Sequence, residues 1–89
     1  MPRHITVPTR IPVPGGKTIE EHVGRLNTGT DALSVAHMVA PPGWDEPAQV
    51  PAFDEVTIVL SGTMRVEYDG GHVDVGAGET VLCEAGERV

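Results

Sequence analysis

The chain has 89 residues, and its six Lys and Arg against thirteen Asp and Glu give a formal net charge of −7 at pH 7. This length allows one domain with a modest core, and the acidic charge argues against nucleic acid as a partner because it repels a phosphate backbone. There is no apolar run of about 18 residues and no signal-peptide pattern, so we expect a cytoplasmic protein without membrane contact. The single cysteine, Cys83, cannot form an internal disulfide, and we expect it to be buried and inert.

The first 30 residues are rich in proline. Pro8, Pro12 and Pro14 interrupt the stretch 5–16, and proline cannot donate to a sheet ladder. We therefore predict an N-terminal arm or edge strand over residues 1–30 and a β-barrel core over residues 31–89. Within the arm, the stretch KTIEEHVGRL fits two turns of helix or a bent strand, because Gly24 and the β-branched residues weaken a helix. Both alternatives stay open at this point.

From Asp31 onward, short apolar or alternating stretches separated by Gly, Pro and Asp predict an antiparallel β domain. Residues 32–40 are expected to form a strand that carries His37 and several aliphatic residues on one face. Residues 55–60, EVTIVL, are apolar on both faces, which predicts a covering layer from the same chain or from a partner. Residues 63–68 alternate between apolar and polar side chains, and the DGG that follows predicts a hairpin turn into a returning strand.

Five positions around the start of this apolar strand carry a family resemblance. Gly43, Gln49, Pro51, Glu55 and Gly62 follow the spacing G-x5-H-x-H-x3-E-x6-G. That spacing is the first sequence motif of the cupins, which are small barrels of two antiparallel sheets. The chain thus resembles the cupins, and the resemblance implies an all-β, cupin-like double-stranded β-helix (jelly-roll) barrel.

The second cupin motif is also matched in its spacing. Gly78, Glu84, Gly86 and Val89 stand at the positions of G-x5-P-x-G-x2-H. Cupins of this kind continue with one or two strands that close the barrel, so we expect either a truncated chain or closure by a neighbouring subunit. Because an open barrel exposes strand edges that invite pairing, we expect a homodimer.

The resemblance does not extend to the family's metal ligands. In metal-binding cupins the two His and the Glu of the first motif and the His of the second hold a divalent ion. Here Gln49, Pro51 and Val89 replace the three His and only Glu55 is retained. Gln is a weak ligand, and Pro and Val have no side-chain donor. We therefore predict no cofactor, and a weakly held metal at His37, Glu55 and Gln49 is the alternative.

A narrower similarity covers FDEVTIVLSGTMRVEYDG, which looks like one stretch of the ethanolamine-utilisation cupins of the Q type. Those proteins also lack the His pair and have been linked to an acetate-kinase-like activity. The present chain has no Gly-rich loop that would cradle phosphates and no cluster of Lys or Arg that would hold a nucleotide. These absences from the sequence disfavour a kinase activity.

The candidate site is centred on Glu55. A desolvated carboxylate inside a barrel can act as a general acid or base, and His37 is predicted to be its catalytic partner. The predicted ligand-binding residues are Gln49, Trp44, Phe53 and Tyr68. The alternatives are that Glu55 caps backbone amides or pairs with Arg25 or Arg65, that His37 is a core residue, and that the aromatic residues fill the core.

These residues lead to one functional hypothesis and two alternatives. The first is a cupin that binds a small molecule in its barrel, with metal-independent acid/base chemistry at Glu55. The first alternative is a non-catalytic structural or regulatory cupin whose barrel is filled by its own side chains. The second is a metal-dependent cupin enzyme with a non-standard ligand set. Neither nucleic acid nor a membrane is an expected partner.

Overall fold

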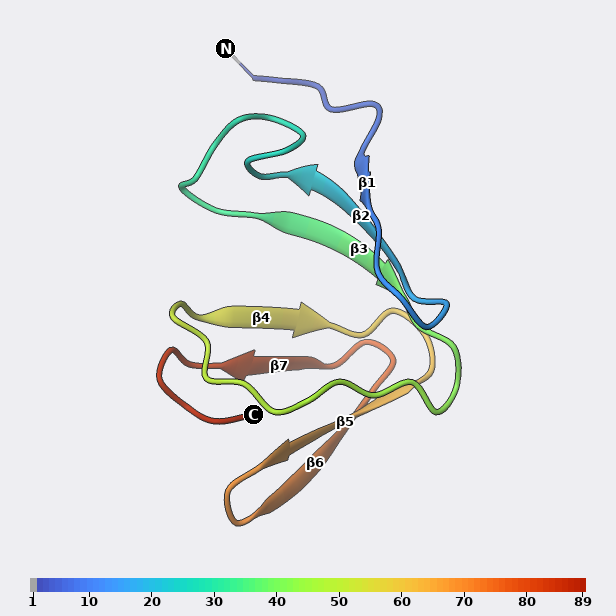
Figure 1. Cartoon of the computed structure of the whole chain (residues 1–89), viewed down its shortest axis with the longest axis vertical. Coiled ribbons are helices and arrows are strands. Elements are labelled where there is room, and N and C mark those ends of the chain that lie inside the picture. Colours follow the sequence, from blue (N-terminus) through green and yellow to red (C-terminus); the bar gives the residue numbers. More distant parts are fainter. Residues whose placement is uncertain (1) are drawn as a thin grey trace. The chain divides into compact units, whose positions relative to one another are not determined.

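The computed structural model describes residues 2–89, and within this range the chain folds into β-strands without a helix (Figure 1). Accordingly, no helix among the described residues is long and apolar enough to cross a membrane. All strand pairs are antiparallel, which confirms the predicted all-β class. The strands are β1 (Thr9–Ile11), β2 (Thr18–Val23), β3 (Val35–Val39), β4 (Glu55–Ile58), β5 (Thr63–Tyr68), β6 (Gly71–Gly76) and β7 (Thr80–Cys83).

The strands belong to two compact units. The N-terminal unit ends at Asp45 and contains β1, β2 and β3, and the C-terminal unit is Glu46–Val89 and contains β4 to β7. β2 lies within the predicted arm and β3 within the predicted barrel core. The predicted boundary between residues 30 and 31 stays a prediction.

The N-terminal unit is a three-stranded sheet in the order β1-β2-β3. β1 lies at the edge of the sheet, and Pro8 and Pro12 flank it, which limits it to three residues. In the stretch KTIEEHVGRL the bent-strand alternative is correct, since β2 pairs with β3 and the register shifts between Glu21 and Val23. Such a bulge bends the strand and strengthens its local twist.

Glu21 is the buried charged residue of the N-terminal unit, with 9% of its surface exposed. Its Oε2 accepts hydrogen bonds from the backbone N–H groups of Leu26 at 3.0 Å and Asn27 at 2.9 Å. The carboxylate therefore holds the loop that follows β2. Gly24 has φ +155°, and a Cβ there would collide with this carboxylate, so glycine is needed for the close approach.

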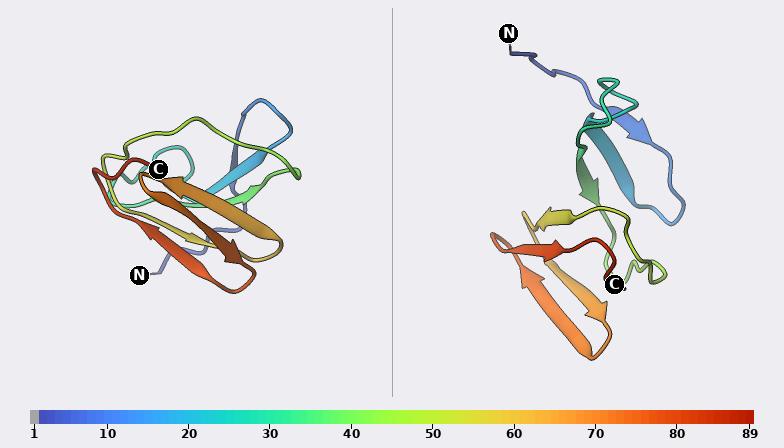
Figure 2. Two further views of the ribbon diagram at one scale, coloured as in Figure 1. Left: turned by 90° about the horizontal axis from the view of Figure 1, so that it is seen from below. Right: turned by 90° about the vertical axis from the view of Figure 1, so that its left-hand side faces the viewer.

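The C-terminal unit consists of two strand pairs, β4 with β7 and β5 with β6. β5 and β6 form the predicted hairpin, in which Tyr68 lies opposite Gly71 and Gly70 has a positive φ of 104° in the turn. The hairpin runs obliquely to the β4–β7 pair (Figures 1 and 2). The core of this unit is small, because its buried apolar residues are Val59, Val75 and Cys83. The predicted burial of Cys83 is thus confirmed.

In the stretch EVTIVL, of which Glu55–Ile58 form β4, one face is partly covered, since Glu55 is half-buried, Thr57 is exposed and Val59 is buried. Val59 is 8% exposed, whereas Val56, Ile58 and Leu60 are 64%, 60% and 71% exposed. The covering layer that the sequence predicts for this second face is therefore not supplied within the C-terminal unit.

Candidate functional site

The motif positions Gln49 and Val89 are directly paired through their backbones. The N–H of Gln49 donates to the carbonyl of Val89 at 2.8 Å, and the N–H of Val89 donates back to the carbonyl of Gln49 at 3.0 Å. Next to this pair, the N–H of Gly86 donates to the carbonyl of Pro51 at 2.9 Å. The positions where metal-binding cupins carry their three His thus lie on two adjacent segments of the C-terminal unit.

Glu55 begins β4 on the side of the strand pair that carries the buried residues Cys83 and Val59 and the exposed Thr57. It lies directly opposite Cys83 of β7, and alternation along the strand puts it on the same face as Val59. Glu55 is half-buried, while Val59 and Cys83 are buried. We call these three residues the Glu55 face.

The pKa of the Cys83 thiol depends on the burial and the negative charge of the Glu55 face. Burial raises its pKa, and the carboxylates of Glu55 and Glu87 raise it further. Each of these effects disfavours the thiolate. Cys83 is therefore held as a neutral thiol, which agrees with its predicted inertness.

The carboxylate of Glu55 has no hydrogen-bond or ion-pair partner within the C-terminal unit, Glu46–Val89. Arg65, one of the two partners considered from the sequence, is bound instead to Asp74, with Nε at 2.8 Å from Oδ1 and Nη2 at 3.3 Å from Oδ2. Glu55 is therefore available to an external donor.

Two predicted ligand-binding aromatic residues of the C-terminal unit are exposed. Phe53 precedes β4 and is 63% exposed, and Tyr68 ends β5 and is 49% exposed. Neither is core filler, so that alternative is wrong for both. Their rings are exposed and free to contact a ligand.

The predicted catalytic partner His37 lies in the other unit. It sits in the middle of β3, is exposed, and pairs across the sheet with Glu20, whose carboxylate lies 3.6 Å from Nη2 of Arg10. The alternative of a core histidine is therefore wrong. His37 instead ends a row of polar residues that crosses the three strands.

Trp44 also lies in the N-terminal unit, where it is half-buried. The Nζ of Lys17 lies 4.1 Å from the centroid of its ring, which is cation–π geometry. The N–H of Trp44 closes a turn by donating to the carbonyl of Pro41 at 3.1 Å. One face of the ring is therefore already occupied by Lys17.

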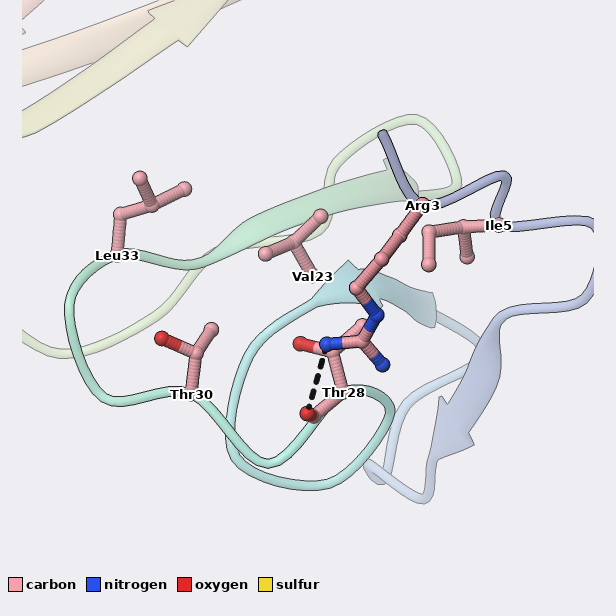
Figure 3. Close-up of a pocket in the computed structure, with 6 residues that line it drawn as sticks. All are labelled: Arg3, Ile5, Val23, Thr28, Thr30 and Leu33. Carbon is pink, nitrogen blue, oxygen red and sulfur yellow. Dashed lines mark hydrogen bonds between the residues drawn. The ribbon is translucent and has the colours of Figure 1, made fainter. Parts of the chain in front are cut away.

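A cavity of about 320 Å³ lies in the N-terminal unit, and sequence reasoning did not find it (Figure 3). The guanidinium of Arg3 lies beside Thr28, where Nη1 donates to the carbonyl at 3.4 Å, and aliphatic side chains complete the lining. None of the six predicted site residues lines it. The lining residues are Arg3, Ile5, Val23, Thr28, Thr30 and Leu33.

The residues at the family's ligand positions do not fit a divalent metal. Of the four positions only Glu55 offers a strong ligand atom, and Pro51 and Val89 offer none. Across residues 2–89, no three side chains of His, Cys, Asp or Glu gather closely enough to hold an ion.

Comparison with known proteins gives one family and one relative. The sequence model described as "Cupin domain" matches residues 36–88, which is more than half of the chain. A protein of Myxococcus xanthus (strain DK1622) named "Endoribonuclease YbeY" is 53% identical over 79 residues, which cover 89% of this chain and 27% of that protein. The chain thus spans about a quarter of the length of the curated relative it matches. No solved structure matches the chain significantly.

Proposed function

Because the chain belongs to the cupin family, we propose that it binds a small organic molecule on the Glu55 face. The observation that carries this proposal is the half-buried residue Glu55, whose carboxylate has no hydrogen-bond or ion-pair partner within the C-terminal unit. A polar group at the edge of an apolar surface gains stability when a ligand supplies the missing partner.

The chemistry of this face defines the class of ligand. The carboxylate of Glu55 selects a hydrogen-bond donor or a positive charge, such as an amine or a hydroxyl group. Beside it, Val59 and Cys83 favour an apolar body. The carboxamide of Gln49 is a further proposed contact that both donates and accepts, and Phe53 and Tyr68 are proposed to cover the ligand with their exposed rings.

Any chemistry at this site would be proton transfer by Glu55. The residues at the motif positions do not fit a metal, and a carboxylate can take or give a proton once a bound ligand shields it from water. His37 as the partner of Glu55 stays a prediction, because the two residues belong to different units. Binding is therefore the core of the proposal.

A ligand screen with matched variants tests the proposal. Thermal shifts are measured for the wild type, for Glu55→Gln and for Glu67→Gln, which removes an exposed carboxylate from β5. Loss of a hydrogen bond to a charged group weakens binding by about 10- to 100-fold. We expect this loss for Glu55→Gln and unchanged binding for Glu67→Gln. Hits that bind Glu55→Gln as tightly as the wild type would refute the site.

Cleavage of RNA is the second candidate function, since the relative from Myxococcus xanthus is named an endoribonuclease. Most of that protein lies outside the aligned segment, and the net charge of −7 of the present chain repels a phosphate backbone. We therefore expect the purified chain neither to bind nor to cleave labelled single-stranded RNA at physiological salt. Cleavage that is lost in Glu55→Gln would favour this second candidate over small-molecule binding.

A further inference from the structure

The cavity of about 320 Å³ in the N-terminal unit is formed by that unit alone (Figure 3). Arg3 and Ile5 come from the segment before β1, and Val23 ends β2. The other three lining residues belong to the segment between β2 and β3. Pockets that bind small molecules enclose about 300 to 1,000 Å³. This cavity lies at the lower end of that range, which fits a small ligand.

Hydrogen bonds within the unit hold the parts of the chain that form the cavity. The backbone N–H groups of Thr28 and Gly29 donate to the carbonyl of Gly24 at 3.0 Å and 2.9 Å. The hydroxyl of Thr28 donates to the same carbonyl and accepts from the N–H of Gly24, both at 3.1 Å. β1 is tied to this turn, since the hydroxyl of Thr9 donates to Oδ1 of Asn27 at 2.7 Å. The lining is thus ordered before a ligand arrives, which reduces the entropy lost on binding.

The polar side chains of the cavity that can still bind a ligand are hydrogen-bond donors. The guanidinium of Arg3 offers several N–H donors, and within residues 2–45 it donates only from Nη1 to the carbonyl of Thr28 at 3.4 Å. The hydroxyl of Thr30 accepts from the N–H of Ala32 at 3.2 Å, and its O–H has no acceptor within residues 2–45. Because the hydroxyl of Thr28 already donates and accepts, Arg3 and Thr30 remain as donors to a ligand.

The charge of the cavity is opposite to that of the whole chain. Arg3 contributes a positive charge, and none of the Asp and Glu side chains of residues 2–45 lines the cavity, although the chain carries a net charge of −7. A guanidinium binds a carboxylate through two parallel hydrogen bonds. The aliphatic side chains of Ile5, Val23 and Leu33 favour an apolar body beside that carboxylate.

We propose that this cavity binds a small aliphatic monocarboxylate. Its carboxylate accepts hydrogen bonds from Arg3 and Thr30, and its hydrocarbon body lies against the aliphatic lining. An anion without such a body, for example inorganic phosphate, makes the charged contact but leaves the aliphatic side chains exposed to water. The site lies outside the Glu55 face, which selects a donor or a positive charge, so this proposal does not depend on the proposed function.

The test is a titration of the isotope-labelled full chain with isocaproate, a branched aliphatic carboxylate, followed through the amide resonances by NMR. We expect saturation with a dissociation constant on the order of 1 mM and the largest shifts at residues 28–33. Isocaproamide keeps the hydrocarbon body without the charge, and we expect it to bind at least about tenfold more weakly. Sodium chloride at the same concentrations is the control for ionic strength.

Two pairs of variants assign the contacts. Arg3→Gln removes the charge, and we expect it to weaken isocaproate at least about tenfold and to leave isocaproamide unchanged. Arg25→Gln removes an exposed arginine of the same unit that does not line the cavity, and we expect no effect. Thr30→Val removes the hydroxyl and should weaken isocaproate about fivefold, whereas Thr30→Ser retains the hydroxyl and the affinity. An unchanged pattern of amide resonances outside the cavity shows that each variant is folded.

The carboxylate and the cavity can each be refuted. Equal affinity of the wild type for isocaproate and isocaproamide would overturn the proposal, and so would tighter binding of inorganic phosphate. Absence of saturable binding, or shifts confined to residues 46–89, would overturn it as well. Isocaproate that binds Arg3→Gln and Thr30→Val as tightly as the wild type would show that these residues do not form the site.

Discussion

At the scale of single residues, Glu21 is the side chain on which the N-terminal unit depends most. Its Oε2 is the acceptor for the N–H groups of Leu26 and Asn27. We expect Glu21→Ala to lower the free energy of unfolding by about 3 kcal/mol, because two amides in a partly buried loop lose their charged acceptor. Urea denaturation at neutral pH measures the change.

Its sequence neighbour Glu20 provides the control. Glu20 forms an exposed ion pair with Arg10 at 3.6 Å, and such pairs contribute little in water. We expect Glu20→Ala to change the free energy of unfolding by no more than about 0.5 kcal/mol. Equal losses in the free energy of unfolding for Glu21→Ala and Glu20→Ala would contradict the claim that Glu21 stabilises the unit through its burial and its hydrogen bonds to the loop.

The reactivity of the Cys83 thiol tests whether the carboxylate of Glu55 acts on Cys83 across the β4–β7 pair. The pKa of the thiol is raised by burial and then by the carboxylates of Glu55 and Glu87. Removing the charge in Glu55→Gln lowers this pKa, which increases the thiolate fraction, so we expect faster alkylation by iodoacetamide near pH 8. The measurement is the labelling rate of the folded protein, with Glu67→Gln as the unchanged control. An equal rate in Glu55→Gln and the wild type would contradict the placement.

The roles of single residues were harder to predict from the sequence than the strands and the fold class. Glu55 is proposed as a site residue because its spacing from two glycines matches a motif, and its role stays a prediction. Glu21 was missed because its partners are backbone amides, which leave no trace in the identity of residues 26 and 27. His37 was expected among apolar side chains, yet its surroundings are set by Glu20 on the neighbouring strand, and that pairing depends on register.

At the scale of elements, the β5–β6 hairpin carries a prediction on pH. The hydrogen bond from Arg65 holds the pKa of Asp74 below its usual value of 3.8, and the charge of Arg65 acts in the same direction. A lowered pKa in the folded state means that the pair stabilises the protein above the unfolded-state pKa and is lost as the pH falls through the folded-state pKa.

The variant Asp74→Asn isolates this contribution. We expect it to be less stable than the wild type at neutral pH and the gap to close between about pH 4 and pH 2. The effect is small because both side chains are exposed, and added salt should reduce it. Urea midpoints measured over this pH range provide the readout. A gap that stays constant down to pH 2 would show that the ion pair is not its cause.

Elements with strong local signals were predictable. The turn at Gly70 and the alternation along β5 are local properties, and Met64 and Val66 are less exposed than their polar neighbours, as expected. The stretch around β2 was ambiguous because both a helix and a strand were compatible with its residues. Pairing with β1 and β3 decided in favour of the strand, and this is a non-local effect.

At the scale of the whole molecule, the net charge of −7 opposes association of two copies. Salt screens this repulsion and also strengthens apolar burial. We therefore expect the homodimer that is predicted from the sequence to become tighter when sodium chloride is raised from about 0.05 M to about 0.5 M. Sedimentation equilibrium measures the change in dissociation constant. Dissociation at high salt would instead indicate an interface built on ion pairs.

The fold class was predictable at this scale, since the glycine spacing and the short apolar stretches both indicate a β domain and a cupin. What lies against the exposed side chains of Val56, Ile58 and Leu60 was not predictable. EVTIVL shows that two layers are needed, but the residues themselves do not say whether the second layer comes from the same chain or from another.

The central claim is that Glu55 meets a ligand, and the most direct test observes its carboxyl carbon by NMR during titration with a hit from the screen. We predict that the Glu55 resonance shifts progressively and saturates with the dissociation constant obtained from thermal shifts, while the Glu67 resonance stays constant. Saturation of binding with an unchanged Glu55 resonance would contradict the claim.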